Sequence, residues 1–184
     1  MKLFNIFKRK NKNEVITVCD YDDNNPYINS LKNVKIYKSM QSYQYEDTVV
    51  FVPPVTCGKV IKVYDGDTIT IASTLPFKKS PIYRFSVRIA GIDCPEIRTK
   101  NVNEKYCANL AKEFIHNLVN DKIVTLENIR TEKYGRILAD VYCDGISLGE
   151  ALLKEKLAVK YDGKTKSVPV NWVEFHLGDK HLPH

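Results

Sequence analysis

The sequence of 184 residues lacks the long apolar runs, paired cysteines and internal repeats that would assign it to several common classes of protein. Charges at Lys2 and Lys8 interrupt the apolar residues near the start, which are too few for a secretory signal or a transmembrane helix. The five cysteines are an odd number, lie far apart and include no Cys-x-x-Cys pair. This pattern argues against a zinc site and a complete disulfide framework, and it indicates a reducing compartment such as the cytoplasm.

Beyond its first residues the sequence has almost no excess of positive charge. The net charge is +6, but five of the 28 lysines and arginines lie within residues 1–12, which contain no acid, so 23 bases face 22 acids elsewhere. Binding of nucleic acid by the main body must therefore depend on a few local cations. Residues 1–12 combine apolar and basic side chains, and they suit either a solvated tail or a weak contact with a membrane surface.

The amino-acid composition changes near Thr48, where a stretch rich in asparagine, lysine and aspartate is followed by short apolar runs separated by turns. We expect a basic, partly disordered extension over 1–47, a folded domain over 48–167 and a tail over 168–184. We also expect a monomer.

Alternating polar and apolar residues predict strands, and apolar residues three or four positions apart predict helices. Strands are expected at 59–64, 68–71, 83–89, 122–126 and 137–142, and helices at 104–119 and from a cap at Ser147 to about 156. In the first helix the apolar stripe consists of Tyr106, Leu110, Phe114 and Leu118, with Cys107 and Ala111 beside it. This order predicts an α+β, mainly β fold, a five-stranded barrel of oligonucleotide-binding (OB) type with two or three packed helices.

Two aspartates lie at bends between the expected strands. Asp67 belongs to the tetrad Asp-Gly-Asp-Thr at 65–68, and carboxylates such as those of Asp67 and Asp93 are ligands that Ca²⁺ and Mg²⁺ prefer. Asp93 follows Arg88 by an odd number of residues, so a regular strand would point the two side chains to opposite faces. Gly91 between them can re-aim the chain. Taken alone, the tetrad is equally compatible with an ordinary turn between strands.

Two arginines and a glutamate complete a set of side chains suited to phosphate chemistry. Arg88 and Arg136 carry planar guanidinium groups, each able to pair with two phosphate oxygens. Glu96 can orient or deprotonate a water beside a metal-bound phosphate. For each residue an ordinary surface role is the alternative. Together these side chains predict metal-assisted cleavage of a phosphodiester bond.

In these motifs the sequence resembles the staphylococcal nuclease (thermonuclease) family. The resemblance covers roughly residues 59–166 and rests on four stretches: Asp-Gly-Asp-Thr at 65–68, Val-Arg-Ile-Ala-Gly-Ile-Asp-Cys-Pro-Glu at 87–96, Lys-Tyr-Gly-Arg at 133–136 and Leu-Ala-Val-Lys-Tyr-Asp-Gly at 157–163. It implies Ca²⁺-dependent hydrolysis of DNA or RNA that leaves 3′-phosphate ends.

The resemblance also implies a role for each of several residues. The metal ligands would be Asp67, Asp93 and, through its backbone carbonyl, Cys94; the catalytic residues would be Arg88, Glu96 and Arg136; the substrate contacts would be Lys133, Tyr134 and Tyr161. Some features depart from the family pattern: Cys94 replaces the usual threonine, the loop over 74–81 is longer, and the long C-terminal helix is stunted or absent. Two other interpretations stay open, a non-catalytic module that binds nucleic acid or protein and a membrane-associated nuclease.

Overall fold

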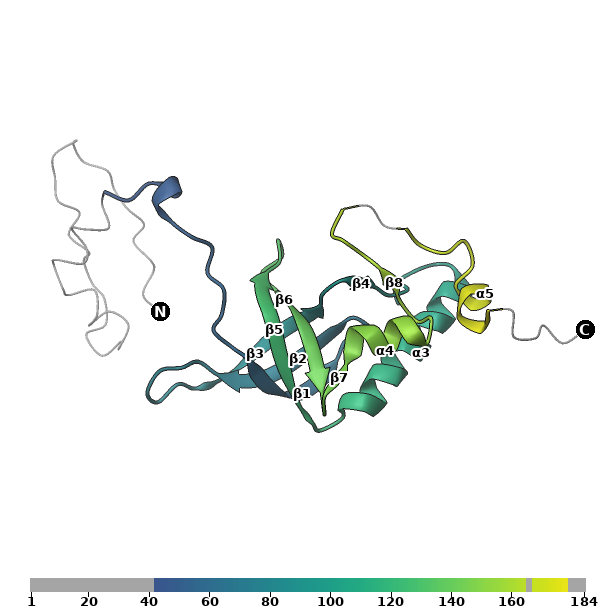
Figure 1. Ribbon diagram of the computed structural model, residues 1–184, viewed down its shortest axis with the longest axis horizontal. Coiled ribbons are helices and arrows are strands. Elements are labelled where there is room, and N and C mark those ends of the chain that lie inside the picture. The colour runs from purple at the N-terminus through teal and green to yellow at the C-terminus, as the bar shows by residue number, and fades with distance from the viewer. Residues whose placement is uncertain (1–41, 165–166, 179–184) are drawn as a thin grey trace, which may run out of the picture. The chain divides into compact units, whose positions relative to one another are not determined.

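The computed structural model describes residues 42–164 and 167–178 and divides the chain into two units, with the boundary between Val49 and Val50 (Figure 1). The described part of the first unit contains the 3-10 turn η1 (Tyr45–Asp47). The predicted membrane contact over 1–12 and most of the predicted extension lie outside the described residues. The second unit contains the barrel.

Five strands form a closed barrel in the order β3-β2-β1-β5-β6, with each neighbouring pair antiparallel. The barrel closes where β3 pairs in parallel with β6, for example Val87 with Ile137. The predicted OB-type barrel is therefore confirmed, and each predicted strand is present with one or both ends shifted. The strands are β1 (Cys57–Val63), β2 (Thr68–Thr74), β3 (Ile82–Ile89), β5 (Ile123–Thr131) and β6 (Ile137–Cys143).

Helices and short strands complete the described part of this unit. Each helix begins after a residue whose side chain accepts hydrogen bonds from first-turn N–H groups, which satisfies backbone donors that lack a partner within the helix. Figure 1 shows the helices beside the barrel, with α3 contacting β1, α4 and α5. These elements are α3 (Val102–Val119), α4 (Leu148–Lys154), α5 (Trp172–Leu177), the paired strands β4 (Ile92–Asp93) and β8 (Val159–Lys160), and β7 (Ile146–Ser147) beside β6.

Helix α3 faces the barrel with a different stripe from the predicted one. Its buried side chains are Cys107, Ala108, Ala111, Ile115 and Val119. Tyr106, predicted to face inward, is 56% exposed, and the other members of the predicted stripe are only partly buried at the edge of the core. Small residues face the barrel because α3 lies close to the 65–68 turn: a Cβ added to Gly66 would lie 2.7 Å from the Ala111 Cβ.

The predicted tail over 168–184 contains the short helix α5, which packs on α3. Trp172 is 3% exposed, and its ring meets the Phe175 ring edge-on with 5.8 Å between centroids. His176 Nδ1 also lies 2.8 Å from the Glu155 carbonyl oxygen. The C-terminal helix that the resemblance placed in doubt is thus present in a shortened form.

Two predictions can be compared with the described residues: the absence of a transmembrane helix and the absence of a complete disulfide framework. No helix in 42–164 or 167–178 combines the length and the apolar character needed to cross a membrane. Cys57, Cys94, Cys107 and Cys143 are all free thiols, whereas Cys19 lies outside the described residues.

Candidate active site

Three charged side chains meet where β2 begins and β3 ends. Arg88 donates through Nη1 to Asp67 Oδ2 and through Nη2 to Asp93 Oδ1, the second contact at 3.0 Å. The side chains of Arg88, Asp67 and Asp93 are only 11%, 8% and 5% exposed. Burial alone would lower the pKa of Arg88, but the charges of the two aspartates outweigh it and raise that pKa. We call these three side chains the Arg88 cluster.

A backbone hydrogen bond and a glycine turn bring the cluster together. The Ile89 N–H donates to the Asp67 carbonyl oxygen at 2.8 Å, which ties the end of β3 to the start of β2. Gly91 then adopts a φ of +75°, a conformation that L side chains rarely take. This turn lets Asp93 point toward Arg88, as the position of Gly91 predicted.

Arg136 reaches the same cluster through Thr68. Its Nη1 lies 3.4 Å from Thr68 Oγ1, and that hydroxyl donates to Asp67 Oδ1 at 2.8 Å. On its other edge the guanidinium donates to both carboxylate oxygens of Glu132, from Nε at 2.6 Å and from Nη2 at 2.8 Å. These two hydrogen bonds raise the pKa of Arg136 and lower that of Glu132. Glu132 therefore fixes the guanidinium with Nη1 directed at the cluster.

Asp65 and Cys94 lie against Asp67. Burial raises the pKa of Asp65 to about 6, and the neighbouring Asp67 charge adds to the rise. Cys94 is buried, with its backbone N–H 3.4 Å from Asp67 Oδ2. Burial and then the aspartate charges raise the pKa of its thiol well above the usual value, so the thiol stays protonated. Of the groups of Cys94, the backbone carbonyl is the one suited to a hard cation.

Glu96 lies in the loop that follows Asp93, and it is exposed. Its N–H donates to Glu104 Oε1 at 3.2 Å, and its carbonyl oxygen accepts from the Thr99 N–H at 3.4 Å. Because Glu104 belongs to the first turn of α3, the helix holds the loop that carries Glu96. The catalytic role assigned to Glu96 stays a prediction.

The predicted substrate-binding residues divide into two groups. The Tyr161 ring centroid lies 6.0 Å from the Arg88 guanidinium carbon, so Tyr161 adjoins the cluster. Lys133 Nζ instead lies 4.9 Å from the centroid of the Tyr134 ring, which is 74% exposed. Lys133 and Tyr134 thus form a pair of their own on the turn between β5 and β6.

The oxygen atoms of the cluster fit a hard divalent cation. Asp67 and Asp93 offer buried carboxylates, the donors that Ca²⁺ prefers. Among the residues that the structure describes, no group of three or more histidine, cysteine, aspartate or glutamate side chains is arranged to hold a metal ion. A cation here would therefore need backbone carbonyl, water and phosphate oxygens as further ligands, and it would compete with Arg88 for the two carboxylates.

Comparisons with known proteins connect this geometry to a family. A family model described as staphylococcal nuclease homologue matches residues 86–171, which include Arg88, Asp93 and Arg136. The chain is 30% identical over 128 residues to a probable endonuclease of Schizosaccharomyces pombe and 28% identical over 118 residues to an uncharacterized endonuclease of Escherichia coli. The match over residues 86–171 and the relatives named endonucleases support a staphylococcal nuclease-like family for this chain.

The similarity to these relatives covers only part of each chain. It takes in 58% of this chain and 56% of the yeast protein, and 61% of this chain and 69% of the E. coli protein. An uncharacterized protein of Bacillus anthracis is 32% identical over 100 residues, which are 53% of this chain and 44% of that protein. The family model begins within β3, so the place of Asp67 in the site rests on its contacts with Arg88.

The sequence alone did not identify the roles of two residues in this site. Thr68 links Asp67 to Arg136, and Glu132 fixes Arg136 from the other side. The Glu132 N–H donates to the Arg136 carbonyl oxygen at 2.9 Å, so the two residues face each other across a short turn. The expected strands ended at 126 and began at 137, so they gave no reason to pair Glu132 with Arg136; β5 in fact continues to Thr131, which brings the two residues to either side of a short turn.

Proposed function

We propose that this protein is a Ca²⁺-dependent nuclease that hydrolyses phosphodiester bonds of DNA or RNA and leaves 3′-phosphate ends. The observation that carries the proposal is the Arg88 guanidinium between two buried aspartates, with the Arg136 guanidinium directed at the same point through Thr68. Carboxylates that suit a cation thus lie beside two guanidinium groups that suit a phosphate. The endonuclease names of two relatives support the same reaction class.

In this proposal the arginines bind the phosphate. Each guanidinium presents several N–H donors in one plane and remains charged as negative charge builds on the phosphate oxygens. Arg88 is nearly buried, and its electrostatic interactions are stronger there than in bulk water. Glu132 limits the orientations open to Arg136, so less conformational entropy is lost when that side chain meets a phosphate.

The acidic residues have two roles in this proposal: two of them bind the cation, and one acts on the attacking water. Asp67, Asp93 and the Cys94 carbonyl would hold Ca²⁺, which when bound would draw negative charge away from the phosphate. Glu96 takes the proton of the attacking water, a role that requires a carboxylate within hydrogen-bonding reach of that water. Its loop is held to α3 through Glu104, which restricts the positions that the carboxylate can take.

The proposal is tested with the full chain and end-labelled single-stranded DNA and RNA oligonucleotides. We expect cleavage with Ca²⁺ that stops on addition of a chelator, and products that a 3′-end polymerase extends only after phosphatase treatment. Absence of cleavage with Ca²⁺, Mg²⁺ and Mn²⁺, combined with retained oligonucleotide binding, would overturn the nuclease proposal in favour of a binding module. Cleavage that persists in chelator would overturn the metal requirement alone.

Glu132→Gln should lower kcat on the order of tenfold with a smaller change in KM, because a neutral amide cannot accept two charge-assisted hydrogen bonds from Arg136. The measurement is kcat and KM on one oligonucleotide, with Glu127→Gln as the control, because Glu127 is an exposed residue of β5, the strand that ends just before Glu132. Added to Arg136→Lys, the Glu132 change should have little further effect. An equal loss in both backgrounds would show that Glu132 does not act through Arg136.

A further inference from the structure

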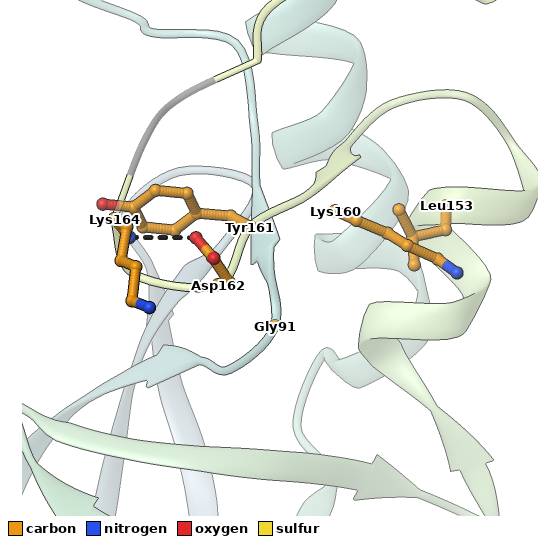
Figure 2. Close-up of a pocket in the computed structure, with 6 residues that line it drawn as sticks. All are labelled: Gly91, Leu153, Lys160, Tyr161, Asp162 and Lys164. Carbon is orange, nitrogen blue, oxygen red and sulfur yellow. Dashed lines mark hydrogen bonds between the residues drawn. The ribbon is translucent and has the colours of Figure 1, made fainter.

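A pocket of about 550 Å³ opens at the Gly91 turn (Figure 2). Of the residues around it, Gly91 and Tyr161 also belong to the site described above. The lining residues are Gly91, Leu153, Lys160, Tyr161, Asp162 and Lys164.

This pocket lies next to the Arg88 cluster, and Gly91 and Tyr161 connect the two. Gly91 lies between Arg88 and Asp93 in the chain, and its carbonyl oxygen accepts a hydrogen bond from the Tyr161 N–H at 2.9 Å. The Tyr161 ring that lines the pocket has its centroid 6.0 Å from the Arg88 guanidinium carbon. A polynucleotide strand with one phosphate at Arg88 can therefore continue past Tyr161 into the pocket.

The pocket has one lysine on either side. In Figure 2, Lys164 lies with Tyr161 and Asp162 on one side of Gly91, and Lys160 lies with Leu153 on the other. The Lys164 N–H donates to Asp162 Oδ1 at 3.0 Å, which closes a local turn and holds the first group together. The two lysines thus flank the pocket on opposite sides of Gly91.

The chemistry of this lining selects an anion that also carries a flat or apolar part. The lining has two ammonium groups and one carboxylate, and within residues 42–164 and 167–178 neither lysine forms an ion pair. The Tyr161 ring and the Leu153 side chain offer surfaces on which a planar ring can pack. The volume is in the range usual for small organic ligands, and it is larger than a bare phosphate ion needs.

We propose that this pocket is a second nucleotide subsite, which binds the nucleotide next to the one whose phosphate lies at the Arg88 cluster. Lys160 and Lys164 pair with the phosphates on its two sides, and its base packs between Tyr161 and Leu153. The proposal rests on the proposed function, because the ligand is a neighbouring part of the same polynucleotide. It predicts that affinity depends on substrate length beyond the nucleotides that the cluster itself contacts.

The test compares wild type with the double variant Lys160→Ala/Lys164→Ala. Binding of a fluorescent dinucleotide and of a fluorescent eight-nucleotide single strand is followed by anisotropy in chelator, so that no cleavage occurs. We expect the double variant to bind the longer strand on the order of tenfold more weakly and the dinucleotide within about twofold of wild type. The slope of log Kd against log salt for the longer strand should fall by about 0.7 for each phosphate that no longer pairs with a lysine.

Two further variants make the result specific. Lys78→Ala/Lys79→Ala removes the same charge from the exposed loop between β2 and β3 and should keep the wild-type length dependence. Lys160→Arg/Lys164→Arg keeps the charge and should keep most of the affinity for the longer strand. All the exchanged lysines are exposed, and a thermal melt checks that each variant is folded.

The outcomes separate this inference from the proposed function. Equal losses for both lengths, or no loss for either, would overturn the subsite and leave nuclease activity untouched. A wild-type protein that binds the longer strand through these lysines but never cleaves it would support the subsite and overturn the nuclease proposal. A wild-type protein that binds neither strand would overturn the subsite as well.

Discussion

Arg88→Ala should lower kcat/KM by roughly 10²–10⁴-fold, because it removes a buried, planar cation from the point where charge builds on the phosphate. It should also destabilise the protein, by about 3–5 kcal/mol, because Asp67 and Asp93 would remain buried without their shared counter-charge. The free energy of unfolding from urea titration and kcat/KM on one oligonucleotide measure the two effects separately.

Added Ca²⁺ separates the structural part of this effect from the catalytic part. A cation bound to Asp67 and Asp93 replaces the missing positive charge, so Ca²⁺ should restore part of the stability of Arg88→Ala through preferential binding to the folded state. It should not restore cleavage, because a metal ion does not supply the paired N–H donors of a guanidinium. Recovery of stability without activity would support both roles.

Arg84→Ala is the matched control for this experiment. Arg84 and Arg88 lie four positions apart on the same strand, so both belong to one face, but the Arg84 side chain is exposed. Its replacement should change stability by less than about 0.5 kcal/mol and leave cleavage near wild type. Near-normal cleavage and stability in Arg88→Ala itself would contradict the assignment of Arg88.

Features of this site that depend on local rules were predictable from the sequence. Alternation placed β2 and β3, and a glycine at position 91 was the visible cause for Asp93 to turn toward Arg88. The tetrad at 65–68 was ambiguous between a metal site and a plain turn. The structure shows that it is a turn whose Asp67 carboxylate also contacts Arg88.

Features that depend on distant contacts were not predictable in the same way. The face of α3 follows its fit against Gly66, where only a small side chain such as Ala111 can approach, and periodicity alone favoured the larger residues beside it. The pocket beside Tyr161 forms because the two-residue strands β4 and β8 pair, and strands this short leave no periodic pattern in a sequence.

Glu96→Gln should lower kcat by roughly 10²–10⁴-fold with little change in KM, because glutamine keeps the size of the side chain but cannot accept a proton. The exposure of Glu96 means that this change should leave the free energy of unfolding close to that of wild type. Single-turnover cleavage at saturating oligonucleotide measures the chemical step without a contribution from product release.

Glu113→Gln, the same substitution at an exposed position of α3, is the control for the charge change and should cleave at the wild-type rate. Glu104→Gln adds a second comparison, because its amide oxygen can still accept the Glu96 N–H, so the loop should keep its position and most of its activity. A variant at Glu96 with normal kcat and raised KM would assign that residue to substrate binding. Normal values of both would remove it from the reaction and direct the search for the proton acceptor to Asp65, because burial raises the pKa of that carboxyl to about 6 and so makes its carboxylate a stronger base than that of an ordinary aspartate.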